Sequence, residues 1–167
     1  RKNLGKELAK EADVNADLVV PVPDSGVPAS LGYAEESGKQ FELGLIRNHY
    51  VGRTFIEPTQ NIRSLGVKLK LSSTKTIVKN KSIILIDDSL VRGTTCHKIV
   101  KMLYEAGAKE IHVRIACPEI KFPDFYGVDM PTKKELLAHE KSLDEMSNYI
   151  KAKSLKFLSI NGLYKAL

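Results

Sequence analysis

The segment that decides the fold runs from Ile83 to Thr95 and reads IILIDDSLVRGTT. It opens with a short run of branched apolar residues, Ile83–Ile86, which is typical of a strand buried on both faces. Two aspartates follow the run directly, and a loop containing Gly93 leads into residues whose apolar positions recur at helical spacing. A buried strand followed by a loop and a helix is the repeating unit of a parallel sheet, so this segment predicts an α/β domain.

The rest of the chain continues the same alternation of strands and helices. We expect strands at residues 17–22, 41–46, 75–78, 82–87, 110–116 and 156–158. We expect helices at residues 3–13, 27–36, 94–106 and 161–167, with two more beginning at the capping-box pairs Thr132/Glu135 and Ser142/Glu145. Gly38 and Gly107 are placed to end two of these helices. The predicted fold class is α/β, with a parallel sheet flanked by helices on both faces.

Size and composition narrow the classes of function. The chain has 167 residues, of which 43% are hydrophobic and 28% charged, as expected for one globular domain. No apolar run approaches the roughly 20 residues needed to cross a bilayer, so no membrane partner is expected. The net charge of +6 is distributed along the chain rather than concentrated, and nucleic acid is therefore not the favoured partner. Two cysteines, Cys96 and Cys117, are too few for a disulfide framework, which indicates a cytoplasmic protein.

The acid pair that follows the apolar run Ile83–Ile86 is the strongest candidate site. Ligands of open parallel sheets bind beyond the carboxyl ends of the strands, where Asp87 and Asp88 are predicted to lie. Two adjacent carboxylates in such a place repel each other and lose hydration. They need a divalent cation or hydroxyl donors, such as the diol of a ribose. The simpler alternative is that the two acids merely open a turn.

The loop after the acid pair predicts an anion site. The segment runs from Ser89 to Thr95 and ends where a helix begins, and the first amides of a helix have no intrahelical partner. Gly93 allows the backbone to come close to a phosphate, and the hydroxyls of Thr94 and Thr95 add donors. Neither a P-loop nor a dinucleotide-binding glycine pattern is present. Carboxylates followed by a phosphate cradle match a sugar phosphate.

A hydrophobic strand, two acids and a Gly/Thr loop together resemble the substrate-binding motif of the type I phosphoribosyltransferases. The resemblance implies that Asp87 and Asp88 hold the ribose hydroxyls of phosphoribosyl pyrophosphate, directly or through Mg²⁺, with Asp88 among the catalytic residues. It also places Ser89 in the substrate site. Residues 92–95, namely Arg92, Gly93, Thr94 and Thr95, are then expected to cradle the 5-phosphate.

A second loop follows another predicted strand and reads Pro-Val-Pro-Asp-Ser-Gly at residues 21–26. Its composition alone is that of an ordinary turn. In the type I phosphoribosyltransferases, however, the pyrophosphate loop lies at this place. The resemblance implies that Asp24, Ser25 and Gly26 receive the leaving pyrophosphate, and that the Ser25 hydroxyl is a metal ligand alongside the two aspartates.

Three further segments narrow the resemblance. They are RNHYVGRTFI at residues 47–56, PEIKFP at 118–123 and YGVDMP at 126–131. With them, nearly the whole chain is similar to the glutamine phosphoribosylpyrophosphate amidotransferases. In that family residues 47–56 correspond to a flexible loop that closes over the substrate and excludes water. Arg53, as a catalytic residue, and Arg47 are expected to stabilise the charge of the departing pyrophosphate.

The resemblance implies a reaction and a set of partners. Residues 1–167 are expected to be the phosphoribosyltransferase domain of such an enzyme, in which ammonia displaces pyrophosphate and yields 5-phosphoribosylamine in purine synthesis. The chain begins at Arg1, and nothing in it resembles the family's N-terminal glutaminase domain, so we expect a fragment of a longer enzyme. Feedback inhibition by purine nucleotides and a homo-oligomer are also implied. No iron–sulfur cluster is expected, because cysteines are few and Asp124 stands where some relatives have one.

Two alternatives remain open from the sequence. One is a regulator without catalytic activity that senses phosphoribosyl pyrophosphate with the same fold, although no DNA-binding helix-turn-helix is evident. The other is a salvage transferase that acts on a preformed base, for which no base-recognition segment is clear.

Overall fold

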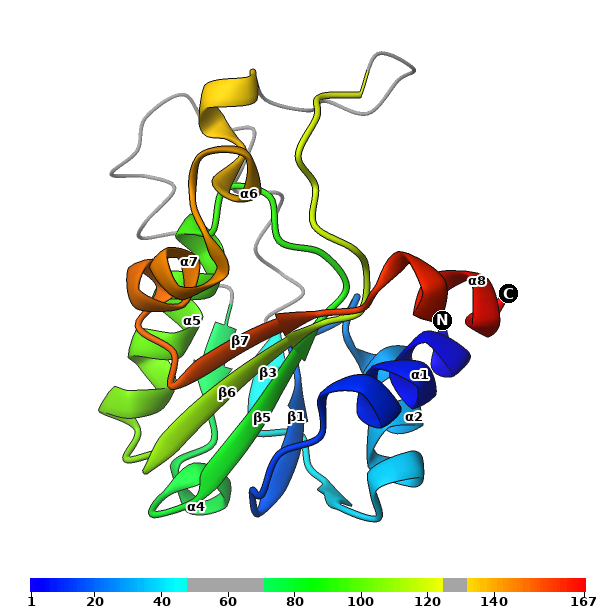
Figure 1. The fold of residues 1–167 in the computed structure, drawn as a ribbon. Coiled ribbons are helices and arrows are strands. Elements are labelled where there is room, and N and C mark those ends of the chain that lie inside the picture. The colour runs from blue at the N-terminus through cyan, green and yellow to red at the C-terminus, as the bar shows by residue number, and fades with distance from the viewer. Residues whose placement is uncertain (48–70, 125–131) are drawn as a thin grey trace.

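A five-stranded parallel sheet forms the centre of the protein (Figure 1). The computed structural model describes residues 1–47, 71–124 and 132–167. The strand order is β2-β1-β5-β6-β7, with β1 at Leu18–Pro21, β2 at Gln40–Phe41, β5 at Ser82–Asp87, β6 at Glu110–Ile115 and β7 at Ser154–Phe157. Every neighbouring pair in this sheet is parallel, which confirms the α/β prediction.

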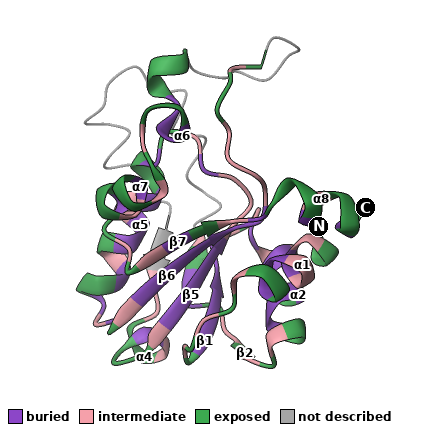
Figure 2. Ribbon diagram, viewed as in Figure 1, coloured by how far each residue is buried: buried purple, intermediate pink, exposed green. Residues whose placement is uncertain are grey.

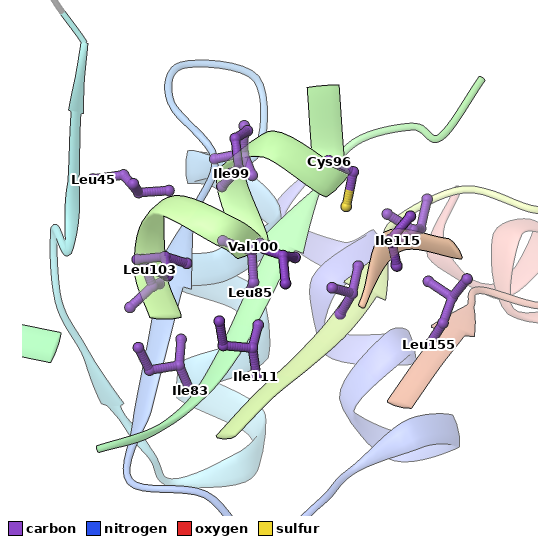
Figure 3. Packing of buried hydrophobic residues seen from close by; sticks show 14 of the residues in the cluster. Leu45, Ile83, Leu85, Cys96, Ile99, Val100, Leu103, Ile111, Ile115 and Leu155 are labelled. Atoms are coloured by element: carbon purple, nitrogen blue, oxygen red, sulfur yellow. The ribbon is translucent and has the colours of Figure 1, made fainter. Parts of the chain in front are cut away.

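Helices cover both faces of the sheet. One face carries α1 (Lys2–Ala12), α2 (Val27–Ser37) and α8 (Ile160–Ala166), and the other carries α5 (Thr94–Glu105) and α7 (Leu143–Ile150). The apolar run of β5 serves both faces because side chains alternate along a strand. Ile83 and Leu85 pack with α5 (Figure 3). Ile84 and Ile86 point to the opposite face and pack with α1 and α2. All four are fully buried, and Figure 2 shows the same burial along the central strands.

Helices α1 and α2 cross at two glycines. A Cβ on Gly5 would lie 1.8 Å from the carbonyl oxygen of Ala29, and one on Gly32 would lie 1.9 Å from the carbonyl oxygen of Lys2. The two backbones therefore approach more closely than any side chain would allow.

Among the described residues, no helix is long and apolar enough to span a membrane.

Two predicted strands differ from the structure. Residues 41–46 divide between β2 and β3 (Leu45–Arg47), and β3 pairs antiparallel with β4 (Leu71–Ser73) in a separate sheet. The break falls at Gly44, whose hydrogen positions face the packed side chains of Val20 and Val78. Residues 75–78 form the short helix α4 (Lys75–Val78) rather than a strand. Isoleucine and valine are enriched in strands, but this preference depends on context, and here the amides of Ile77 and Val78 donate to the carbonyl of Thr74 in a helical turn.

The predicted helix ends are mostly confirmed. Gly38 and Gly107 have φ of 67° and 99° and follow α2 and α5. Ser142 forms the expected capping box with Glu145 at the start of α7. The prediction for Thr132 is wrong. The chain there forms a single 3₁₀ turn, η2 (Lys133–Glu135), followed by α6 (Leu137–Glu140), and no side chain caps it.

Candidate functional site

The loops that follow β1 and β5 lie side by side at the carboxyl edge of the sheet. The two strands are neighbours, with Pro21 in register with Ile86, and the amide of Val22 donates to the carbonyl of Ile86 at 2.8 Å. The Ser25 hydroxyl then donates to Oδ1 of Asp87 at 3.3 Å. The structure thus brings together the acid pair and the Pro-Val-Pro-Asp-Ser-Gly loop, which are 62 residues apart in the sequence.

Hydrogen bonds fix the carboxylate of Asp87. Its Oδ1 also accepts the backbone N–H of Asp88 at 2.8 Å, and Oδ1 of Asp88 accepts from the Ser89 hydroxyl at 3.0 Å. Burial raises the pKa of Asp87 to about 7, and the negative charge of Asp88 adds to the rise, while the bonds from the Asp88 amide and Ser25 oppose it. A partly buried carboxylate with a raised pKa is stabilised by a positive ligand.

The oxygen atoms at this edge suit Mg²⁺. Asp87, Asp88 and Ser25 supply two carboxylates and a hydroxyl, which are the hard donors that this ion prefers. Within the described part of the chain, no cluster of three or more His, Cys, Asp or Glu side chains is placed to hold a metal alone. A partial set fits Mg²⁺, because the ion usually keeps several waters and takes further oxygens from a bound phosphate.

The start of α5 has the features of an anion cradle. Gly93 precedes the helix with φ of 73°, a left-handed conformation that favours glycine, and no side chain caps the first turn. The side chains of Thr94 and Thr95 are exposed at this end. The free amides and the helix dipole favour a negatively charged group there.

The Arg92 side chain is engaged elsewhere. Its Nε donates to Oε2 of Glu135 in η2 at 2.7 Å, and both side chains are about half exposed. The sequence placed Arg92 in the phosphate cradle and Glu135 in a capping box. In the structure these two side chains bind each other, and the amide of Glu135 donates to the carbonyl of Thr132 rather than to its hydroxyl.

Arg47 lies beside the loop that follows β1. Its Nη1 donates to Oδ2 of Asp24 at 2.5 Å, so its charge stands at the loop expected to receive pyrophosphate. Gly26 lies at the start of α2, where a Cβ would fall 2.4 Å from the carbonyl oxygen of Ile86. The other predicted arginine, Arg53, falls outside the described residues.

The sequence does not identify three residues that contact the loop before α5. Glu135 pairs with Arg92, and the side chains of Leu137 and Tyr149 lie against Gly93. No local pattern marks them, because a capping box, an apolar residue and a helical tyrosine are common features. Their role is visible only when the chain after residue 132 is seen to fold back onto the loop.

Comparisons with known proteins identify the family of the chain. The family model for the phosphoribosyl transferase domain matches residues 2–152. The chain is 61% identical to an amidophosphoribosyltransferase of Rhizobium etli and 54% identical to one of Methanocaldococcus jannaschii, over 100% of this chain but only 34% and 36% of theirs.

A solved structure of glutamine phosphoribosylpyrophosphate amidotransferase from B. subtilis, complexed with ADP and GMP, superposes with a TM-score of 0.88. It is 53% identical, over 99% of this chain and 36% of that one. The chain thus spans about a third of the length of these relatives, and the expected type I fold is confirmed. Because the family model extends over both loops and the strands that carry them, the chain belongs to the phosphoribosyl transferase domain family.

Proposed function

We propose that this chain is the phosphoribosyltransferase domain of an amidophosphoribosyltransferase. The reaction is displacement of pyrophosphate from C1 of phosphoribosyl pyrophosphate by ammonia, which yields 5-phosphoribosylamine at the first step of purine biosynthesis. The observation that carries the proposal is the contact between Ser25 and Asp87, which joins an acid pair to a second loop at one sheet edge. The similarity to amidophosphoribosyltransferases along the whole chain supports the choice of acceptor.

The acid pair and the start of α5 bind opposite ends of the sugar phosphate. Asp87 and Asp88 accept hydrogen bonds from the ribose hydroxyls, and the amides from Gly93 to Thr95 bind the 5-phosphate at the helix terminus. Asp87, Asp88 and Ser25 would hold Mg²⁺, which would supply positive charge for the pyrophosphate oxygens. Held at both ends, the sugar presents C1 to the acceptor in a fixed orientation, from which much of the rate arises.

The loop after β1 receives the leaving group. The amides of Asp24 and Ser25 lie at the same edge as Asp87 and bind the departing pyrophosphate, while the Gly26 amide donates to the carbonyl of Val22 at 2.9 Å and holds the turn. Arg47, tethered to Asp24, and Arg53 add positive charge where negative charge develops, an effect worth on the order of a few kcal/mol. The carboxylate of Asp88 stabilises the cationic character that the sugar acquires.

The longer relatives suggest how the domain is supplied and controlled. We propose that a glutaminase domain provides ammonia from glutamine, and that purine nucleotides inhibit the enzyme in a homo-oligomer. The solved relative complexed with ADP and GMP supports the nucleotide part of this proposal.

The test supplies different nitrogen donors to the 167-residue chain. Pyrophosphate release is measured with Mg²⁺ and phosphoribosyl pyrophosphate, in the presence of ammonium chloride, of glutamine or of free nucleobases. We expect turnover with ammonium alone, and its loss in Asp88→Asn but not in Glu140→Gln, an exposed carboxylate on α6. Turnover only with a nucleobase indicates a salvage transferase, and tight binding without turnover indicates a regulator; either result refutes the proposal.

A further inference from the structure

The chain between Lys133 and Ile150 folds back onto the loop that precedes α5. In Figure 1, α6 lies above the carboxyl edge of the sheet, next to the segment that connects β5 to α5. Three elements take part, namely η2, α6 and α7. Their contacts involve the residues just before Gly93, Gly93 itself and the first turn of α5.

Two polar contacts hold the residues before Gly93. The first contact is the ion pair of Arg92 and Glu135, in which Nε and Oε2 are 2.7 Å apart. In the second contact, the amide of Leu137 donates to the carbonyl of Val91 at 2.9 Å. Neighbouring Leu90 is 3% exposed and packs in the same core cluster as Leu137. This stretch of the loop is therefore tied to α6 by side chain and by backbone.

Gly93 is enclosed by two apolar side chains. A Cβ added to it would lie 2.7 Å from Cδ2 of Leu137 and 3.1 Å from Cε1 of Tyr149. The carbonyl of Tyr149 also lies 2.8 Å from Nδ1 of His97, in the first turn of α5. Leu137 and Tyr149 thus form a wall on the side of the glycine where a Cβ would lie.

We infer that Glu135, Leu137 and Tyr149 are positioning residues that fix the phosphate loop in its binding conformation. The inference rests on the proposed function, since it assigns these residues to the 5-phosphate half of that site. It also assigns Arg92 a new role. Its guanidinium holds the loop through Glu135, and the phosphate is bound by backbone amides and threonine hydroxyls. A loop fixed before binding loses less conformational entropy when the ligand arrives.

The experiment compares two ligands that occupy different halves of the site. Titration calorimetry with Mg²⁺ measures the dissociation constants of ribose 5-phosphate and of inorganic pyrophosphate for Glu135→Gln, Arg92→Gln and the double variant. We expect each single change to weaken ribose 5-phosphate by about two- to fivefold, because the ion pair is half exposed. Pyrophosphate binding stays unchanged, and the double variant is no weaker than either single one, because both remove the same contact.

Matched variants separate positioning from general damage. The exchanged pair Arg92→Glu with Glu135→Arg restores ribose 5-phosphate binding, whereas a glutamate at 92 that faced the phosphate would repel it. Tyr149→Phe keeps the wall and binds normally, but Tyr149→Ala weakens ribose 5-phosphate by about tenfold. Glu140→Gln, on the same segment, changes neither ligand. In turnover assays the loss in Glu135→Gln lies in KM for phosphoribosyl pyrophosphate and not in kcat.

Each contrary result has a distinct meaning. If Glu135→Gln binds ribose 5-phosphate as tightly as the wild type or more tightly, while Arg92→Gln binds it more weakly, then Arg92 is a direct phosphate ligand. This result overturns the inference. Equal loss of both ligands shows only structural damage and also overturns it. A wild-type chain that binds ribose 5-phosphate with the expected variant pattern but never releases pyrophosphate refutes the proposed function and keeps the inference. Absence of ribose 5-phosphate binding in the wild type refutes both.

Discussion

Replacing Gly26 with alanine tests whether the spacing of the two loops governs activity. Gly26 begins α2, and its φ of −76° is accessible to any residue, so the change introduces no backbone strain. The added Cβ would lie 2.4 Å from the carbonyl oxygen of Ile86 and 2.9 Å from that of Val22. Both neighbours are backbone atoms in or beside the sheet, which cannot rotate away as a side chain can.

The magnitude follows from these distances. Real Cβ atoms essentially never approach closer than 3.0 Å, so the loop must move by roughly 0.6 Å or more away from β5. The Ser25–Asp87 bond is already 3.3 Å long and breaks with such a movement. Overpacking of this size costs about 1–3 kcal/mol of stability, and a shift approaching 1 Å at a reacting centre lowers turnover by about a hundredfold.

Gly38→Ala is the matched control. Gly38 ends the same helix with φ of 67°, and no atom lies within 4 Å of the position that its Cβ would take. Its replacement costs about 1–2 kcal/mol through the left-handed backbone alone. The two variants therefore lose similar stability for different reasons, and only one of them disturbs the site.

The assay measures urea unfolding and ammonia-dependent pyrophosphate release for both variants. We expect comparable losses in the free energy of unfolding, with a large fall in kcat/KM for Gly26→Ala and little change for Gly38→Ala. If kcat/KM falls equally in both, loop spacing does not control the chemistry and the reasoning is refuted.

Three further predictions concern metal, pH and packing. Asp87→Asn is expected to abolish Mg²⁺-dependent turnover and to raise the thermal midpoint measured in EDTA, since it removes a partly buried carboxylate next to Asp88. A lower midpoint would contradict this. Burial, aided by the charge of Arg114, lowers the pKa of His112 below its usual 6.5, so its contribution to stability is full above about pH 6.5 and is lost as the pH falls. In urea unfolding, His112→Gln should therefore lose less free energy of unfolding between pH 7.5 and 5.5 than the wild type. An unchanged pH dependence would rule out this residue. Gly5→Ala should lower the free energy of unfolding by about 1–3 kcal/mol or more without changing KM, because the new Cβ would lie 1.8 Å from the carbonyl oxygen of Ala29. A loss below about 0.5 kcal/mol would show that α1 and α2 can move apart easily.

Local patterns were sufficient where one segment makes its own structure. The apolar run of β5, the glycines after α2 and α5 and the Ser142 capping box are each confirmed, because strand alternation, left-handed glycine and a local cap need only nearby residues. Residues 41–46 are strand only at their two ends, and residues 75–78 form a helical turn, because the tertiary context of short segments overrides their strand preference.

The candidate site also has one part that local sequence predicts and one part that depends on tertiary structure. Asp87, Asp88 and the loop to Thr95 could be predicted from the sequence, because a buried strand must deliver its last residues to one edge of the sheet and a helix must begin with free amides. The meeting of Ser25 with Asp87 required β1 and β5 to be neighbours, which strand order decides.

The partner of Arg92 depended on tertiary structure alone. Glu135 lies 43 residues later and fits a local capping box equally well in the sequence. Its carboxylate binds Arg92 because the packing of Leu137 brings η2 to the loop, and long-range packing of this kind leaves no periodic trace along the chain. The sequence by itself determined the strand, the acid pair at its end and the loop that leads into α5, whereas only the folded chain decided what holds that loop in place.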